Sequence, residues 1–234
     1  MLAGFVNTLA GGGSFLTVPL LILVGVPATA ANATNRVGVL IQSLAAIRGF
    51  RQEGVRELGF ALRLLPATLI GAWLGAWAAT QISDALFQQI FGLIMLLALP
   101  LVLRNPLPRS DAEPYGIPVV LQNIIYFAIG FYGGAIQAGI GIPLLLALVG
   151  AGGLDLVRAN SVKVAIIAAL TAVALGQFAW AGVVYWMHGL ALALGSGLGG
   201  YTASRVGARV GERLIRPILG LAIITLALRL VLGS

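Results

Sequence analysis

Long stretches without any charged side chain constrain the fold of this chain more than any other feature. Five of them cover residues 1–35, 64–83, 85–103, 114–154 and 164–204, with His188 set aside. A membrane-spanning helix needs about 20 mostly apolar residues, so each stretch is long enough for one crossing or most of one. Charged residues make up only 9% of the chain, against roughly 25% in a soluble domain. We therefore expect an integral membrane protein.

The apolar runs favour helices over strands. They are rich in Leu, Ala, Gly and Ile and show no alternation with period two, which argues against an outer-membrane barrel. Helices satisfy their own backbone hydrogen bonds in hydrocarbon. The net charge of +7 comes from basic residues that lie mostly in loops, so the positive-inside rule explains it better than nucleic-acid binding. The chain contains no Cys, which excludes disulfides and thiolate metal sites, and we expect no metal and no cofactor.

The sequence repeats itself at an interval of 124 to 128 residues. Ala3-Gly4-Phe5 corresponds to Ile129-Gly130-Phe131, and Pro19 corresponds to Pro143. Further matches in the same order pair Thr34-Asn35-Arg36-Val37 with Ala159-Asn160-Ser161-Val162, Leu74-Gly75-Ala76-Trp77 with Leu198-Gly199-Gly200-Tyr201, and Phe91-Gly92-Leu93 with Leu219-Gly220-Leu221. One match could arise by chance, but a series in preserved order indicates two related halves.

Each half contains four hydrophobic elements, so the predicted fold class is all-α. The first transmembrane repeat covers residues 1–103, with elements near 2–25, 29–48, 58–80 and 85–103. A polar linker follows at 104–116. The second repeat covers 117–234, with elements near 117–149, 156–177, 182–204 and 214–232.

The loop arginines indicate how these elements cross the membrane. If all eight elements cross, six arginines fall on one side and five on the other, whereas the positive-inside rule predicts a bias. If the first element of each repeat enters and returns, the repeats are inverted and all eleven arginines share one side. They are Arg48, Arg51, Arg56, Arg63, Arg104, Arg109, Arg158, Arg205, Arg209, Arg213 and Arg216.

We therefore expect two inverted repeats of about four helical elements, each with a broken, re-entrant first element. The protein would lie in the cell inner membrane, with loops 48–63, 104–113 and 205–216 in the cytoplasm. The expected interruptions are Gly11-Gly12-Gly13 followed by Pro19, and Gly139-Ile140-Gly141 followed by Pro143. Within a helix, Gly costs about 1 kcal/mol and Pro about 3 kcal/mol relative to Ala. Against this view, residues 117–136 are long enough to cross alone.

These glycine motifs carry a resemblance to a known family. The string Gly4-Phe5…Gly11-Gly12-Gly13…Pro19-Leu20-Leu21, followed by Ala33-Thr34-Asn35, resembles the TauE/SafE sulfite exporters, also called 4-toluene sulfonate uptake permeases. The string Gly130-Phe131…Gly139-Ile140-Gly141-Ile142-Pro143 is similar to the same motif, and the likeness covers nearly the whole chain. The resemblance implies a secondary transporter of sulfite, sulfonates or related organosulfur anions, often in the direction of export.

Arg36 and Lys163 are the two basic residues that we place well inside crossing segments. A charge there costs at least about 2.5–3.5 kcal/mol and usually marks a pathway, although a long side chain near a helix end can instead snorkel to the interface. A cation carrier normally needs an intramembrane carboxylate. All seven acidic residues lie in or beside loops: Glu53, Glu57, Asp84, Asp111, Glu113, Asp155 and Glu212. The charges themselves therefore favour an anionic substrate, with Arg36 and Lys163 as direct contacts.

Neutral polar residues and glycines complete the predicted binding site. Inverted repeats with broken helices usually bind substrate near the bilayer midplane, where amides and hydroxyls donate hydrogen bonds and glycines let the backbone approach. The same residues could instead serve interhelical hydrogen bonds and close packing. The candidates are Asn35, Asn160, Asn32, Thr34, Ser161, Asn7, Ser14, Gln137, Gly12, Gly13, Gly139 and Gly141, with Gln42, Gln122, Asn123 and Gln177 ranked below them.

The single histidine and a group of aromatic residues have simpler interpretations. His188 either relays a proton or packs, and packing is the commoner role of a lone histidine. Phe178, Trp180, Tyr185 and Trp186 are typical of an interfacial aromatic belt.

An alternating-access carrier is the leading hypothesis, and an anion channel of the same fold is the alternative. An enzyme is disfavoured, since the chain has no Cys, no buried acid and one His. The expected partners are the small anion and lipids, while the glycine-rich faces could serve a homodimer or be internal.

Overall fold

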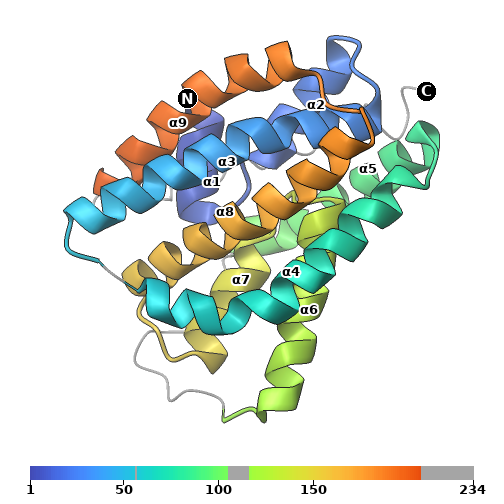
Figure 1. Ribbon diagram of the computed structural model, residues 1–234. Coiled ribbons are helices and arrows are strands. Elements are labelled where there is room, and N and C mark those ends of the chain that lie inside the picture. The colour runs from blue at the N-terminus through green and yellow to red at the C-terminus, as the bar shows by residue number, and fades with distance from the viewer. Residues whose placement is uncertain (56, 105–115, 207–234) are drawn as a thin grey trace.

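The computed structural model describes residues 1–55, 57–104 and 116–206, and within these ranges the chain forms helices and no strand (Figure 1). The all-α prediction is confirmed there. The predicted element near 214–232 and most of the linker lie outside the described residues. So do five of the eleven loop arginines: Arg56, Arg109, Arg209, Arg213 and Arg216.

The first element of each half is broken, as the sequence predicts. Helix α1 covers Leu2–Ala10 and α2 covers Ser14–Leu23. In the second half, α6 covers Val119–Ala135, and α7 covers Gly141–Leu146 before a π-helical turn at Ala147–Ala151. Left-handed backbone causes both breaks, because Gly11 has φ 75°, Gly139 has φ 74° and Gln137 has φ 65°. Such a conformation ends a helix.

The two prolines do not interrupt the helices, so that part of the prediction is wrong. Pro19 lies inside α2, and Pro143 lies in the first turn of α7. A first-turn proline is tolerated because its missing N–H has no partner in a helix anyway. The glycines therefore make the breaks, and the prolines follow them.

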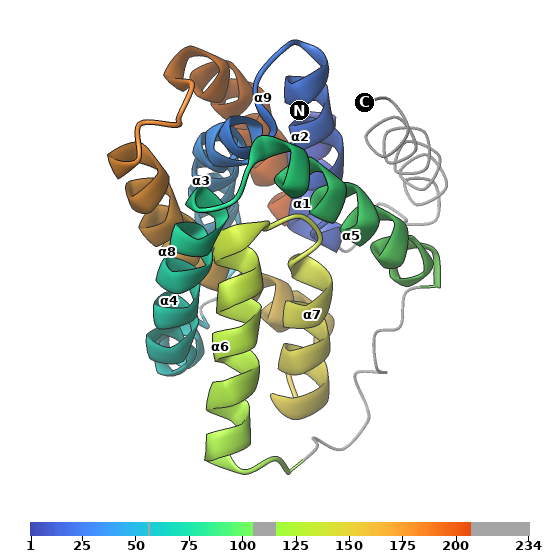
Figure 2. The ribbon, with the colours of Figure 1, turned by 90° about the vertical axis from the view of Figure 1, so that its right-hand side faces the viewer.

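At each break the chain folds back on the helix that it has just left. A Cβ at Gly13 would lie 2.1 Å from the Ala3 carbonyl oxygen of α1. A Cβ at Gly133 of α6 would lie 2.2 Å from the Ile140 side chain. Figure 2 shows α6 and α7 side by side, joined at one end. We call α1–α2 the first hairpin and α6–α7 the second hairpin. Their tips are residues 11–15 and 136–141, which include the first residues of α2 and α7.

The two tips touch each other. A Cβ at Gly11 would lie 2.3 Å from the Gly141 Cα, and a Cβ at Gly139 would lie 2.7 Å from the Phe15 ring. These distances are below van der Waals contact, so only glycine permits the approach. The broken segments of the two halves therefore meet inside the protein.

Five longer helices surround the hairpins: α3 (Ala28–Gln52), α4 (Leu58–Thr80), α5 (Asp84–Arg104), α8 (Leu156–Trp180) and α9 (Trp186–Val206). Helix α4 packs on α6 and α8 of the second half, and α9 packs on α1 and α3 of the first. Glycines allow the backbones to meet at both contacts. A Cβ at Gly75 would lie 2.0 Å from the Phe131 carbonyl, and a Cβ at Gly199 would lie 2.1 Å from the Met1 carbonyl. These glycine faces are therefore internal to the chain.

The ends of the long helices gather into two groups. At one end Arg205 pairs with Glu53 at 3.1 Å, and Arg158 pairs with Glu57 at 3.5 Å. At the other end the Thr29 amide donates to Asp84, and the Tyr185 amide donates to the Thr34 hydroxyl, both at 2.9 Å. The helices between these groups therefore run side by side. The inverted relation of the two halves stays a prediction.

Three of the described helices are long and apolar enough to cross a membrane by length and composition: Gly59–Thr80, Asp84–Leu101 and Leu156–Trp180. Helix α3 has 25 residues, which gives about 37 Å, but its Asn, Thr and Arg residues lower its hydropathy. The outer surface of the protein is apolar at many positions. Among them, Leu97 is 66% exposed and Leu194 76% exposed, as expected for side chains that face lipid.

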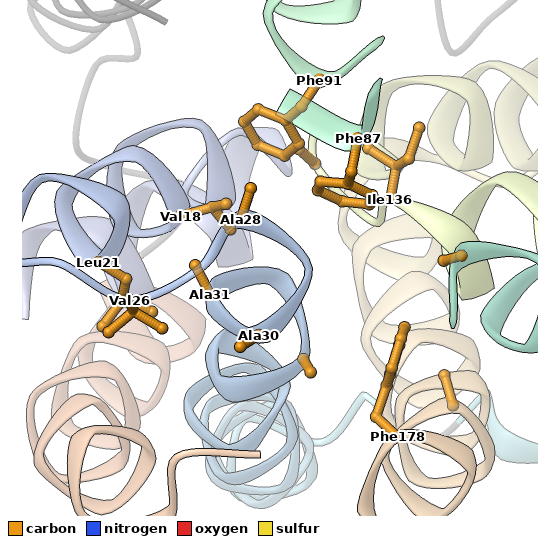
Figure 3. Close-up of a cluster of buried hydrophobic side chains, with 14 of the residues drawn as sticks. Val18, Leu21, Val26, Ala28, Ala30, Ala31, Phe87, Phe91, Ile136 and Phe178 are labelled. Carbon is orange, nitrogen blue, oxygen red and sulfur yellow. The ribbon is translucent and has the colours of Figure 1, made fainter. Parts of the chain in front are cut away.

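One hydrophobic core joins the two halves (Figure 3). Val18 and Leu21 of α2 and Ala31 of α3 belong to it together with Ile136 of the second tip and Phe178 of α8. Phe87 and Phe91 of α5 stack on each other at 6.0 Å and enter the same core. The hairpin tips are thus held by side chains from both repeats.

Candidate functional site

Arg36 lies on α3 and is completely buried against the second hairpin. Its two terminal nitrogens donate to the carbonyl oxygens of Gly133 at 2.9 Å and Gly134 at 2.5 Å, at the end of α6. The guanidinium also stacks over the Phe178 ring of α8, 4.9 Å from its centre. A cation over an aromatic face gains more where water is excluded. The side chain therefore does not snorkel to an interface.

Lys163 lies on α8 and is completely buried against the first hairpin. Its Nζ donates to the carbonyl oxygens of Thr8 at 2.7 Å and Leu9 at 3.4 Å, at the end of α1, and to Asn160 Oδ1 at 2.6 Å. A protonated ammonium group has three hydrogens and can serve all three acceptors. As an ammonium group, Lys163 is a buried cation in the same kind of setting as Arg36.

Both cations bind helix ends. The C-terminal end of a helix carries about half a negative charge and up to four carbonyls without an intrahelical donor. Arg36 and Lys163 donate hydrogen bonds to these carbonyls at the two breaks. Arg36 Nε is buried and has no hydrogen-bond partner among the described residues, so this donor remains for another group.

The electrostatics of the two tips favour negative charge. Helices α1 and α6 end at the tips, and each of these C-terminal ends contributes about half a negative charge. Helices α2 and α7 begin there, and each N-terminal end contributes about half a positive charge, so these contributions cancel. The charges of Arg36 and Lys163 are left. Within the described part of the chain no Asp or Glu side chain is buried. Among the described residues, the centre of the protein is therefore positive and no buried carboxylate neutralises it.

The predicted polar residues of the first half form a connected network around the first hairpin. Asn35 donates to Ser14 at 3.0 Å and accepts from Thr17 at 2.6 Å, which fixes α2 on α3. Asn7 donates to Gln42 at 2.9 Å and accepts from the Gly13 amide at 3.3 Å. These groups bind one another, so the interhelical role that the sequence left open is the one that the contacts display.

The remaining predicted polar residues are spread over both hairpins. Asn32 donates to the Ala135 carbonyl at 2.8 Å, and Gln137 donates to Thr171 at 2.5 Å. Asn160, besides accepting from Lys163, donates to the Leu156 carbonyl one turn earlier in α8. Thr34 accepts from the Tyr185 amide, away from the tips, and Ser161 is buried on α8.

The predicted glycines all lie at the tips. Gly12, Gly13, Gly139 and Gly141 are buried. Gly13, Gly139 and Gly141 are pressed against Ala3, Phe15 and Gly11, respectively. Their contacts are therefore packing contacts, and approach of the backbone to a ligand stays a prediction.

Two further residues contact this network or its cations in ways that sequence reasoning did not predict. Gln42 binds Asn7 and also donates to Thr8 at 3.1 Å. Asn32, Asn35 and Gln42 follow one another at helical spacing along α3, and this polar stripe could have identified it. Phe178 was expected in an interfacial belt, but it is fully buried beneath Arg36.

The other three residues of the predicted aromatic belt lie at the surface, as that prediction requires. Trp180, Tyr185 and Trp186 are exposed, with Trp180 92% exposed. His188 is also exposed, and its ring lies edge-on to Tyr185 at 5.9 Å. Gln122, Asn123 and Gln177 take no part in the contacts of the tips that are described above.

The chain is similar to known membrane transporters over nearly its whole length. The family model described as sulfite exporter TauE/SafE matches residues 1–230. The chain is 29% identical to the probable membrane transporter protein ORF9 of Sinorhizobium sp over 98% of this chain and 88% of the relative. It is 29% identical to the probable membrane transporter protein YfcA of Escherichia coli K12, over 100% of this chain and 87% of the relative. A probable membrane transporter protein of Haemophilus influenzae is 27% identical over 92% of this chain and 85% of its own length.

No solved structure matches the chain with significance. The family match nevertheless covers both hairpins, both buried cations and all of the long helices that the structure describes. This chain therefore belongs to the TauE/SafE family of membrane transporters.

Proposed function

We propose that this transporter carries a small anion and that sulfite or an organosulfonate is the first candidate. The observation that carries the proposal is the pair of buried cations, Arg36 and Lys163, at a centre where no described carboxylate is buried. Buried charges in a membrane protein usually mark a substrate pathway. The family likeness supplies the sulfur chemistry, and the expected direction is export.

The proposed mechanism is alternating access at the hairpin tips. In transporters with inverted repeats, one half or bundle moves against the other around a site near the bilayer midplane. The contact between Gly11 and Gly141 joins the two halves, and this supports a site of that kind beside it. The anion would bind beside the tips, attracted by the positive charge of Arg36 and Lys163, and nearby amide and hydroxyl groups would donate hydrogen bonds to it.

We also propose that the end of the protein with Glu53, Glu57, Arg158 and Arg205 faces the cytoplasm of the inner membrane. The described loop arginines support this orientation through the positive-inside rule. The chain contains no Cys, so a single cysteine at Glu53 or at Ala181 can be labelled from one side of sealed vesicles. Labelling of position 53 from the periplasmic side would contradict the proposed orientation.

Binding is tested first by thermal stabilisation of the purified protein. The panel contains sulfite, sulfate, thiosulfate, sulfoacetate, taurine, acetate and chloride. A ligand at 100 times its dissociation constant adds about 2.7 kcal/mol, which corresponds to a shift of roughly 5–10 °C for a chain of this size. We expect a sulfur oxyanion or a sulfonate to stabilise the protein, and Arg36→Gln or Lys163→Gln to remove the shift.

Arg48→Gln is the matched control, because Arg48 lies on the same helix as Arg36 but is exposed. If cations or neutral solutes shift the melting temperature and no anion does, the charge argument is wrong. Flux measurements in liposomes then separate a carrier, whose rate saturates with substrate, from the alternative, an anion channel with the same fold.

A further inference from the structure

The two buried cations bind carbonyls at corresponding positions of the two halves. Helix α1 ends at Ala10 and α6 ends at Ala135. Counted back from these ends, Thr8 corresponds to Gly133 and Leu9 to Gly134. Arg36 binds the Gly133 and Gly134 carbonyls, and Lys163 binds the Thr8 and Leu9 carbonyls. The acceptors thus occupy corresponding positions at the two helix ends.

The donors, by contrast, are not repeated. At an interval of 125 residues Arg36 corresponds to Ser161, and Lys163 corresponds to Gly38. Two different residue types at non-corresponding positions therefore perform one task at corresponding helix ends. A requirement of the broken helices, and not the duplication alone, explains this arrangement.

The requirement follows from the break itself. Where a helix ends inside hydrocarbon, no water can satisfy its last carbonyls, and each unsatisfied group costs several kcal/mol. At the end of α6, the Ile136 amide binds the Tyr132 carbonyl, Arg36 binds the next two, and Asn32 binds the last. All four terminal carbonyls thus have donors, and three of the four are served by α3.

At the end of α1, the Gly11 amide binds the Asn7 carbonyl at 2.9 Å, and Lys163 binds the next two. In both cases the cation comes from the other half of the chain. Arg36 belongs to the first half and serves α6, whereas Lys163 belongs to the second half and serves α1.

We propose that Arg36 and Lys163 are reciprocal positioning residues, each of which fixes the broken helix of the opposite half. The end of each broken helix is then stable only while the two halves are docked. This role concerns the protein without substrate, so it stands or falls independently of the anion proposed above.

Hydrogen exchange of the full-length protein in detergent tests the proposal. We compare backbone exchange in residues 4–12 and 130–138 among the wild type, Arg36→Met and Lys163→Met. We expect Arg36→Met to accelerate exchange about tenfold or more in 130–138 and to leave 4–12 nearly unchanged, because charge-assisted hydrogen bonds are lost only there. Lys163→Met should give the opposite pattern. Arg48→Met, an exposed change on α3, should alter neither segment.

If each residue only stabilised its own helix, exchange would rise in the half that carries the mutation. Faster exchange in the opposite half therefore distinguishes the proposed role from that one. If exchange rises mainly in the half that carries the mutation, or equally in both segments, the proposal is wrong. Arg36→Lys keeps the charge and covers the case in which Arg36→Met does not fold. It should accelerate exchange only in 130–138 and by less than Arg36→Met would, and acceleration in 4–12 would overturn the proposal.

Discussion

The contact between the hairpin tips can be tested with one methyl group. Gly11→Ala places a Cβ 2.3 Å from the Gly141 Cα, where carbon atoms at rest keep about 3.5–4.0 Å. The tips must therefore separate by more than about 1 Å, and overpacking of this kind costs about 1–3 kcal/mol. Alanine at φ 75° adds about 1–2 kcal/mol of backbone strain. The expected loss of stability is about 2–5 kcal/mol.

Gly25→Ala separates the two contributions. Gly25 also has a positive φ, 91°, but a Cβ there would meet nothing within 4 Å. This variant carries only the backbone strain of about 1–2 kcal/mol. The difference between the two variants is therefore the cost of separating the tips.

Thermal unfolding in one detergent, with both variants and the wild type side by side, measures this difference. We expect Gly11→Ala to melt at least about 2 °C below Gly25→Ala, since 1 kcal/mol shifts the melting temperature of a chain of this size by about 2–4 °C. Flux in liposomes should also fall more in Gly11→Ala. Equal melting temperatures would refute the argument that the tips are in contact.

Three further changes address single contacts. Thr17→Val removes the hydroxyl that binds Asn35 at 2.6 Å and should lower stability by about 1–2 kcal/mol in the same assay, whereas no loss would mean that this hydroxyl does not hold α2 on α3. Asn32→Leu leaves the last carbonyl of α6 without its side-chain donor and should cost about 1–3 kcal/mol, and retention of the wild-type melting temperature would show that another donor replaces it. Arg205→Gln breaks an exposed pair with Glu53 and should leave the melting temperature unchanged at moderate salt, because solvent screens such pairs; a clear drop would contradict this.

Most of the architecture could be predicted from the sequence, because a chain in hydrocarbon must satisfy its own backbone hydrogen bonds and helices do so. The uncharged stretches predict helices, and glycine clusters in matching places predict breaks at residues 11–13 and 139–141. The observed breaks cover residues 11–13 and 136–140. Pro143 was misjudged because it lies in the first turn of the next helix, where a missing N–H matters little, whereas Pro19 lies in the interior of α2 without interrupting it. The inverted relation of the halves, the cytoplasmic side and a possible homodimer remain predictions.

The sequence by itself determined that Arg36 and Lys163 are exceptional, since charges are rare in apolar segments. It did not determine their partners, because carbonyls at the ends of α1 and α6 are backbone groups that every residue has. Which carbonyls lack a donor depends on where each helix stops, and which cation reaches them depends on the packing of α3 and α8 across the halves. Only the tertiary structure decides that each cation serves the opposite repeat. The same holds for Phe178, whose sequence position suggests an interface but whose ring lies buried beneath Arg36.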